Sequence, residues 1–142
     1  METHSNQLED IKQTILLNAP IQKVWETVAT ADGIASWLMP NDFKPEVGFE
    51  FHIQSPFGLS PCKVLEIEEP HHVLIAWDID GWFLSFDLKE VGEKTEFTLI
   101  HGGWKTPNTI ITKANAPSSV IREQMAQGWV KLVQERLKKV VE

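Results

Sequence analysis

The sequence predicts an α+β domain made of one strand, two short helices, a run of antiparallel strands and a long C-terminal helix. Two observations lead to this fold class. Stretches of alternating apolar and polar residues follow one another through the middle of the chain, and a helical apolar stripe runs through its last part. With 142 residues the chain is long enough to bury a core, so we expect one domain, residues 1–142, ordered over about residues 10–141.

The N-terminal part predicts one strand followed by two helices. Residues 1–9 are polar and expected to be frayed, and "DIKQTILLN" then alternates as a strand does. Pro20 suits the first turn of a helix whose apolar residues recur at i, i+3, i+4 and i+7. The segment Thr30-Ala31-Asp32-Gly33 separates it from a second, shorter helix. The apolar positions are Ile21, Val24, Trp25 and Val28 in the first helix and Ile34, Trp37 and Leu38 in the second.

Five further strands are predicted between residues 49 and 104. The first is "FEFHIQ", and "SPFGLSP" after it is expected to be a turn because of its Pro and Gly content. The strand "CKVLEIEE" follows. "VLIAWDI" and "WFLSFDLKEV" form a hairpin, because the Asp80-Gly81 turn needs a positive φ that glycine adopts without strain. With "KTEFTLIHGGW" as the last strand, the sheet has six antiparallel strands.

The C-terminal part predicts an irregular stretch and then one long helix. "KTPNTIITKANAPSS" is irregular by composition, with a helical turn over residues 108–114 left open. A helix from about Ser119 to the end would be roughly 33 Å long, enough to cross a sheet. Its apolar stripe consists of Ile121, Met125, Gly128, Trp129, Leu132, Val133, Leu137 and Val140.

Charge and composition exclude several partners. A formal net charge of −7 works against binding to nucleic acid or to an anionic membrane, because both need a basic surface. The chain starts without the basic and apolar segments of a signal peptide, and no run approaches the ~20 apolar residues of a membrane span. We therefore expect a cytoplasmic protein with no nucleic-acid partner and no membrane insertion.

Metal and cofactor sites are not expected. The five histidines are scattered, and His71 and His72 are adjacent and should point apart. No pair has the spacing of a metal site. Cys62 is the only cysteine, so no intrachain disulfide can form. Neither a nucleophile elbow nor a glycine-rich phosphate loop is present, so no cofactor is predicted.

Several ordered motifs resemble the helix-grip superfamily, also called START-like or SRPBCC. They are "APIQKVWETVATADGIASWLMPNDF", "GFEF", "CKVLEIEEPHHVLIAW", "FTLIHGGW" and Gly128-Trp129. The resemblance is to the AHSA-type branch, named for the activator of the heat-shock-protein-ninety ATPase. Within it, the stretches around "MPNDF", "SPFG" and "HGGW" are similar to small bacillar proteins of the YndB type. It covers about residues 10–141.

This resemblance implies a curved antiparallel sheet that grips the C-terminal helix, with an apolar cavity between them. Members of the superfamily bind lipids, sterols, polyketides and plant secondary metabolites, and some are cyclases or dehydratases. The co-chaperone that gives the branch its name carries a further N-terminal domain, so a chaperone partner is not expected here. A role in the stress response follows from the name of the branch alone.

Alternation places one set of side chains toward the helix. Trp82, Leu84, Phe86 and Leu88 should face inward, while Phe83, Ser85 and Asp87 face outward. We expect the ligand-binding residues to be Trp77, Trp82, Leu84, Phe86, Phe97, Leu99, His101, Met125, Gly128 and Trp129. The same rings could simply form a close-packed core. Gly128, costly in mid-helix, indicates either close approach of helix and sheet or room for a ligand.

Three functions remain open from the sequence. The first is a carrier or sensor for a small hydrophobic, planar molecule such as a lipid, polyketide or aromatic ketone. The second is a cyclase or dehydratase in which His101, with Asp78 or Asp87, acts as acid or base. The third is a protein-binding surface built from exposed aromatics such as Phe83 and Trp104. Arg122 and Arg136 could reach the cavity mouth. Binding is favoured over catalysis, because no second inward polar group lies near His101.

Overall fold

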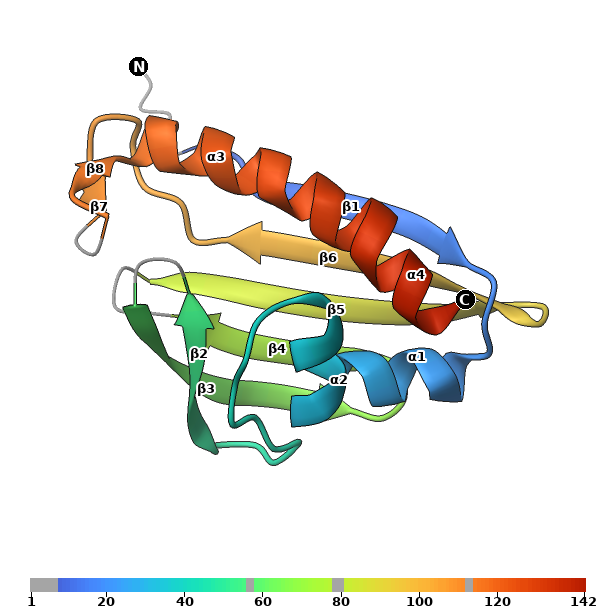
Figure 1. Cartoon of the computed structure of the whole chain (residues 1–142). Coiled ribbons are helices and arrows are strands. Elements are labelled where there is room, and N and C mark those ends of the chain that lie inside the picture. Colours follow the sequence, from blue (N-terminus) through green and yellow to red (C-terminus); the bar gives the residue numbers. More distant parts are fainter. Residues whose placement is uncertain (1–7, 56–57, 78–80, 112–113) are drawn as a thin grey trace, which may run out of the picture.

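Six antiparallel strands form one sheet in the computed structural model, and a long helix lies across one face of it (Figure 1). The structure describes residues 8–55, 58–77, 81–111 and 114–142. The strand order is β1-β6-β5-β4-β3-β2, so that β1 and β2 are the edges. The strands are β1 Ile11–Leu17, β2 Glu50–Ser55, β3 Gly58–Glu68, β4 His72–Trp77, β5 Trp82–Val91 and β6 Lys94–Gly102. The predicted fold class is confirmed.

The central strands alternate as predicted. Along β5 the buried apolar side chains are Trp82, Leu84, Phe86 and Leu88, and they share a face with buried residues of β4 and β6. Ser85, predicted to face outward, is buried as well. Trp82 lies opposite Trp77 on β4, and Leu84 lies opposite His101 on β6. Such directly opposed pairs stabilise a sheet through side-chain contact. The inward face of the sheet is therefore aromatic.

The β4–β5 hairpin forms where Asp80-Gly81 predicts it. Gly81 has a φ of 83°, which is the positive value expected at that position. The last paired residues are Trp77 and Trp82. Ile79 and Asp80, which the prediction placed at the end of the strand and in the turn, lie outside the described residues.

Strand β3 starts earlier than the sequence predicts. The segment "GLSP" was expected to be part of a turn, but Gly58 already pairs with Ser55 of β2. Proline is tolerated here because Pro61 lies just beyond the last pair with β4, Cys62 with Trp77. Farther along, the register with β4 shifts between Val64 and Glu66. A bulge of this kind bends the strand and helps to curve the sheet.

Helices α1 (Ile21–Val28) and α2 (Ala31–Trp37) follow β1 and pack closely on each other. Thr30 accepts a hydrogen bond from the Gly33 amide at 3.0 Å and so caps α2. A side chain at Gly33 would not fit, because its Cβ would lie 2.3 Å from the Glu26 carbonyl oxygen. The Trp37 indole donates to the Thr27 carbonyl at 3.1 Å. These contacts fix the two helices against each other.

Helix α2 covers part of the sheet that the prediction assigned to the C-terminal helix. The Trp37 ring meets Phe86 edge to face at 5.8 Å and Phe97 at 6.1 Å between ring centroids. Such contacts add about 0.5–1.5 kcal/mol per pair beyond area burial. Phe86 and Phe97 are therefore part of a closed core beneath α2.

Where the structure describes the segment before the long helix, it forms a short strand pair and no helical turn. Residues Ile110–Ile111 form β7 and pair with β8, Ala116–Pro117, as a small separate sheet. The expected fraying of residues 1–9 falls largely on residues 1–7, outside the described chain. Leu8 is held in place, because its amide donates to the Lys105 carbonyl at 3.1 Å.

The C-terminal helix runs through α3 (Ser118–Lys131), a π-helical stretch η1 (Leu132–Leu137) and α4 (Lys138–Val141). Its buried residues Val133, Leu137 and Val141 are spaced by four. On an α-helix of 3.6 residues per turn such a spacing drifts round the axis, and the wider π turn offsets the drift. In the described part of the chain, no helix is long and apolar enough to cross a membrane.

The long helix is fastened to the β1 edge along its whole length. Near its start Arg122 donates to the Glu9 carbonyl at 2.7 Å, and midway Gln134 donates to the Thr14 carbonyl at 3.2 Å. At its end the Glu142 carboxylate accepts from the Asn18 amide at 2.8 Å. Figure 1 shows the helix lying beside β1 and β6, away from β2.

A candidate ligand cavity beneath the C-terminal helix

A cavity of about 1010 Å³ lies between the C-terminal helix, the end of α2, β2 and the end of β4. The lining residues are Leu38, Met39, Pro40, Gln54, Trp77, Gln124, Met125, Gly128, Trp129, Lys131, Leu132 and Arg136. Ligand sites in proteins are concavities of roughly 300–1,000 Å³ with mainly apolar walls and a few polar groups. This cavity has that size and composition, and it lies on the side of the helix that is not fastened to β1.

Four of the ten predicted ligand-binding residues line the cavity, namely Trp77, Met125, Gly128 and Trp129. The other six are buried in the core behind this wall: Trp82, Leu84, Phe86, Phe97, Leu99 and His101. Two features separate the groups. Trp37 covers Phe86 and Phe97, and Trp129 lies between the cavity and His101.

Several lining residues were not predicted. Leu38 was expected on the apolar side of the second helix, whereas Met39 and Pro40 follow it in a loop, where no periodicity marks a side chain as inward. Gln54 has the outward position of β2 and reaches the cavity from the sheet edge. Leu132 belongs to the apolar stripe of the long helix, and Arg136 was recognised as able to reach the mouth. Gln124 and Lys131 carried no signal, because an exposed polar residue on a helix is ordinary.

Gly128 borders open space. No heavy atom lies within 4 Å of the position that a Cβ would take there. Close approach of helix and sheet would have placed backbone or side-chain atoms inside that distance. Of the two interpretations of this glycine, the structure therefore supports room beside the helix.

His101 lies behind the cavity wall and binds one of its residues, Trp129. It is fully buried, and its Nδ1 accepts a hydrogen bond from the Trp129 indole at 3.0 Å. Its ring lies 5.1 Å from that of Trp77, 4.8 Å from Trp82 and 4.7 Å from Trp104 between centroids. The imidazole thus fixes the orientation of the Trp129 ring, which is itself part of the cavity lining.

Electrostatics keep His101 neutral. Burial, with a smaller contribution from the charge of Arg122, lowers the pKa of His101 to about 3. Because Nδ1 accepts from Trp129, the ring proton is on Nε2, which has no hydrogen-bond partner among the described residues. The indole N–H groups of Trp77 and Trp82 are likewise buried without a partner there. These three donors lie in one aromatic cluster.

The acid/base groups considered for a cyclase or dehydratase are not brought together. His101 does not line the cavity. Asp87 lies on the opposite face of the sheet, where its carboxylate binds His72 at 2.6 Å. Asp78 lies outside the described residues. The structure therefore gives no support to general acid/base chemistry by His101 and Asp87.

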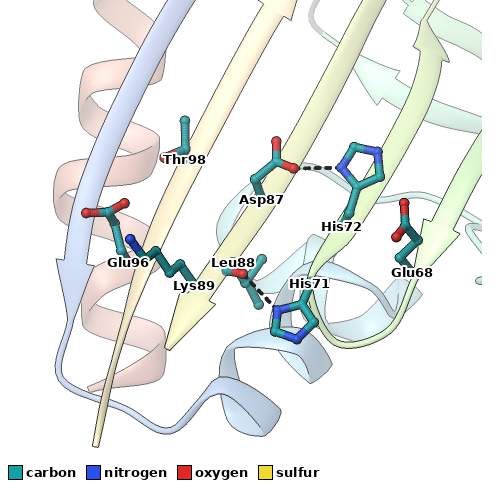
Figure 2. Close-up of a pocket in the computed structure, with 8 residues that line it drawn as sticks. All are labelled: Glu68, His71, His72, Asp87, Leu88, Lys89, Glu96 and Thr98. Carbon is teal, nitrogen blue, oxygen red and sulfur yellow. Dashed lines mark hydrogen bonds and ion pairs between the residues drawn. The ribbon is translucent and has the colours of Figure 1, made fainter. Parts of the chain in front are cut away.

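A second, smaller hollow of about 390 Å³ lies on the face of the sheet away from the helix (Figure 2). His71 and His72 bond to different residues of β5 but both line this hollow. His71 Nδ1 donates to the Leu88 carbonyl at 3.1 Å, and His72 Nδ1 lies 2.6 Å from Asp87. The other lining residues are Glu68, Lys89, Glu96 and Thr98.

The hydrogen-bonding groups of the His72 ring are already bound by the neighbouring residues Asp87 and Glu66. Partial burial lowers the pKa of His72, but hydrogen bonds and charge from Asp87 and Glu66 raise it, and the net pKa lies above the usual value. Both ring nitrogens are occupied, since Nε2 lies 2.8 Å from Glu66. Among the described residues, no group of three or more His, Cys, Asp or Glu could hold a metal ion. The apolar cavity is the stronger candidate site.

Comparison with known proteins agrees with the fold. Residues 18–142 match the family model described as Activator of Hsp90 ATPase homolog 1-like protein. The solution structure of the Bacillus halodurans protein BH1534 is 51% identical, with a TM-score of 0.89 over 96% of this chain and 99% of that one. No curated protein matches the sequence.

Two more distant structures share the fold alone. The solution structure of the Aha1 dimer from Colwellia psychrerythraea is 18% identical, with a TM-score of 0.72 over 95% of this chain and 97% of that one. The crystal structure of CalU16 from Micromonospora echinospora is 19% identical, with a TM-score of 0.72 over 94% of this chain and 74% of that one.

Proposed function

Since this chain belongs to the family of Activator of Hsp90 ATPase homolog 1-like proteins, we propose that it is a binding protein for a small hydrophobic, planar ligand. The observation that carries the proposal is the open cavity of about 1010 Å³ walled by Trp77, Trp129 and Met125. Aromatic rings favour flat, polarisable partners. A lipid, a polyketide or an aromatic ketone fits these walls, and the role is that of a cytoplasmic carrier or sensor.

The cavity can supply micromolar affinity. A ligand that buries roughly 300 Å² of apolar surface gains about 7 kcal/mol from transfer out of water. Lost translational and rotational freedom offsets part of this gain, and ring contacts add to it. Apolar burial alone therefore supports a Kd in the micromolar range, and a tighter complex would need a specific polar contact.

The protein-surface alternative receives no support from the residues suggested for it. Trp104 is 2% exposed, and its indole donates to the His101 carbonyl at 3.0 Å. Phe83 is half-buried. These two rings do not form an exposed aromatic patch.

The site is tested by filling the cavity. Gly128→Leu places a branched side chain in the open space beside the helix, and we expect it to weaken binding of the neutral, planar probe N-phenyl-1-naphthylamine by tenfold or more. The probe fluoresces on transfer to an apolar environment, so a titration gives the Kd directly. Ligand-detected NMR against lipid and natural-product libraries, run on both proteins, then identifies compounds whose signal depends on an empty cavity.

Gln127→Leu is the matched control. It adds the same side chain at the neighbouring, exposed position of α3, outside the cavity lining. This variant should bind the probe as the native protein does. Unchanged affinity in a folded Gly128→Leu protein, checked by circular dichroism and thermal unfolding, would show that the ligand site lies elsewhere.

A further inference from the structure

We infer that the ligand of this cavity carries an acidic group, which Lys131 and Arg136 bind at the mouth while the apolar part lies against Trp77 and Trp129. The inference rests on the proposed function and adds the chemical class of the ligand, an amphipathic anion.

The charged residues that the structure describes at the cavity are all of one sign. They are Lys131 and Arg136, and no Asp or Glu is among the described lining residues. This is notable in a chain with 20 acidic and 13 basic residues. The uncharged polar groups of the lining, the amides of Gln54 and Gln124, can donate to an anion as well.

Both cations lack a partner within the described part of the protein. No ion pair or side-chain hydrogen bond engages Lys131 or Arg136 there. Other cations of the same helix are used: Lys138 lies 2.6 Å from the Glu142 carboxylate, and Arg122 donates to the Glu9 carbonyl. Lys139 also lacks a partner among the described residues, but it lies outside the cavity lining, so Lys131 and Arg136 are the unpaired cations of this helix that border the cavity.

The π-helical stretch accounts for their position on one side of the helix. Residues five apart on an α-helix point about 140° away from each other. The stretch η1 begins directly after Lys131 and includes Arg136, and its i→i+5 hydrogen bonds bring residues at that spacing closer to the same side. Single π turns within helices are frequent at functional sites. Here the turn lets both cations border one cavity.

Depth separates the two parts of the site. Lys131 and Arg136 are exposed, whereas Trp77 and Trp129 are each 2% exposed. An acidic group at the cations stays in contact with water, so it need not pay the large desolvation cost of a buried charge. The apolar body of the same molecule is removed from water. This arrangement suits a carboxylate, sulfonate or phosphate attached to an apolar skeleton.

Two matched dyes test the inference. 8-Anilinonaphthalene-1-sulfonate has the ring system of N-phenyl-1-naphthylamine plus one anionic group. Exposed ion pairs are worth roughly a twofold to fivefold change in affinity each. The double variant Lys131→Gln, Arg136→Gln should therefore weaken binding of the sulfonate by about fivefold to twentyfold. Binding of the neutral dye should stay within about twofold.

Salt and a remote lysine are the controls. Raising the salt concentration from 0.02 to 0.5 M should weaken binding of the sulfonate but not of the neutral dye, because salt screens exposed charges. Lys139→Gln removes one positive charge from the same helix outside the cavity lining, and it should change neither affinity by more than about twofold. Thermal unfolding checks that each glutamine variant is folded.

Competition against the neutral dye distinguishes sources of the acidic group. Decanoate, decyl phosphate, decanol and decylamine share one chain and differ in head group. We expect one of the two anions to compete best and decylamine to compete worst. Preference for decanoate indicates a carboxylic acid ligand, and preference for decyl phosphate indicates a phosphate ester. Equal competition by decanol and both anions would overturn the inference.

Failure of this inference differs from failure of the proposed function. Suppose that both dyes bind, that Gly128→Leu abolishes binding of both, and that the double glutamine variant changes neither affinity. The cavity then binds ligands without selecting for an anion. If Gly128→Leu leaves both dyes bound, the cavity is not the site, and both proposals fall.

Discussion

At Gly128, the absence of a side chain lowers the stability of the helix but leaves space in the cavity for a ligand. A glycine inside a helix is about 1 kcal/mol less favourable than alanine. No atom lies within 4 Å of the position of its missing Cβ, so a methyl group meets no obstacle. We expect Gly128→Ala to raise the free energy of unfolding by roughly 0.5–1 kcal/mol, measured by urea denaturation. A loss of stability would mean that the space beside the helix is smaller than the structure shows.

His101 should make the fold sensitive to acid. Its folded-state pKa of about 3 lies below the unfolded value, so the unfolded chain binds a proton there that the folded chain does not. The stability from neutral His101 is therefore complete above about pH 6.5 and is lost as the pH falls toward 3, at up to about 1.4 kcal/mol per pH unit. An NMR titration should show no protonation of the His101 ring above about pH 4. A transition near pH 6 would contradict this.

His72 should have the opposite effect on stability. The carboxylates of Asp87 and Glu66 raise its folded-state pKa against the opposing effect of burial. Its contribution is complete below the unfolded pKa of about 6.5 and is lost as the pH rises through the raised folded value. We expect His72→Gln to remove this loss, which denaturation curves between pH 6 and 9 would detect. An unchanged pH dependence in that range would show that the network adds no stability.

At the scale of elements, the Thr30 cap connects α2 to the cavity. Its hydroxyl accepts from the Gly33 amide, and α2 leads directly into residues 38–40 of the cavity wall. Thr30→Ala should lower the free energy of unfolding by about 1 kcal/mol, since an N-cap is lost. Thr30→Ser retains the hydroxyl and should restore most of the difference in urea denaturation. Equal stability of both variants would show that the cap is not important for α2.

The elements also show which parts of the structure a sequence can predict. Period-two alternation is a local property, so the inward faces of β4, β5 and β6 followed directly from it. The β7–β8 pair was missed because pairing between short segments depends on the rest of the fold. The sequence also could not show which inward-facing aromatic residues line the cavity and which lie in the core, for a similar reason. Whether Phe86 borders open space depends on Trp37, a residue distant in sequence.

At the scale of the whole molecule, the C-terminal helix has one fastened side and one open side. Arg122, Gln134 and Glu142 join it to the flanks and backbone of β1. On the other side it faces β2 and the loop after α2 across the cavity. Each hydrogen bond is worth only about 0.5–1.5 kcal/mol, but the three are spread along the helix and resist its separation from β1. For the proposed ligand we therefore expect entry from the β2 side.

Hydrogen exchange can test this asymmetry. Free of ligand, the amides of residues 38–41 and of β2 should exchange faster than those of β1 and β6, because they border the open side. Saturation with N-phenyl-1-naphthylamine should slow exchange in residues 38–41, of which 38–40 line the cavity, and in the stretch 124–136, which supplies its helical wall. Strand β1 should change least, since its contacts with the helix are already made. If the ligand slows exchange chiefly in β1, the expectation is wrong. The ligand would then enter on the side of the helix that is hydrogen-bonded to β1.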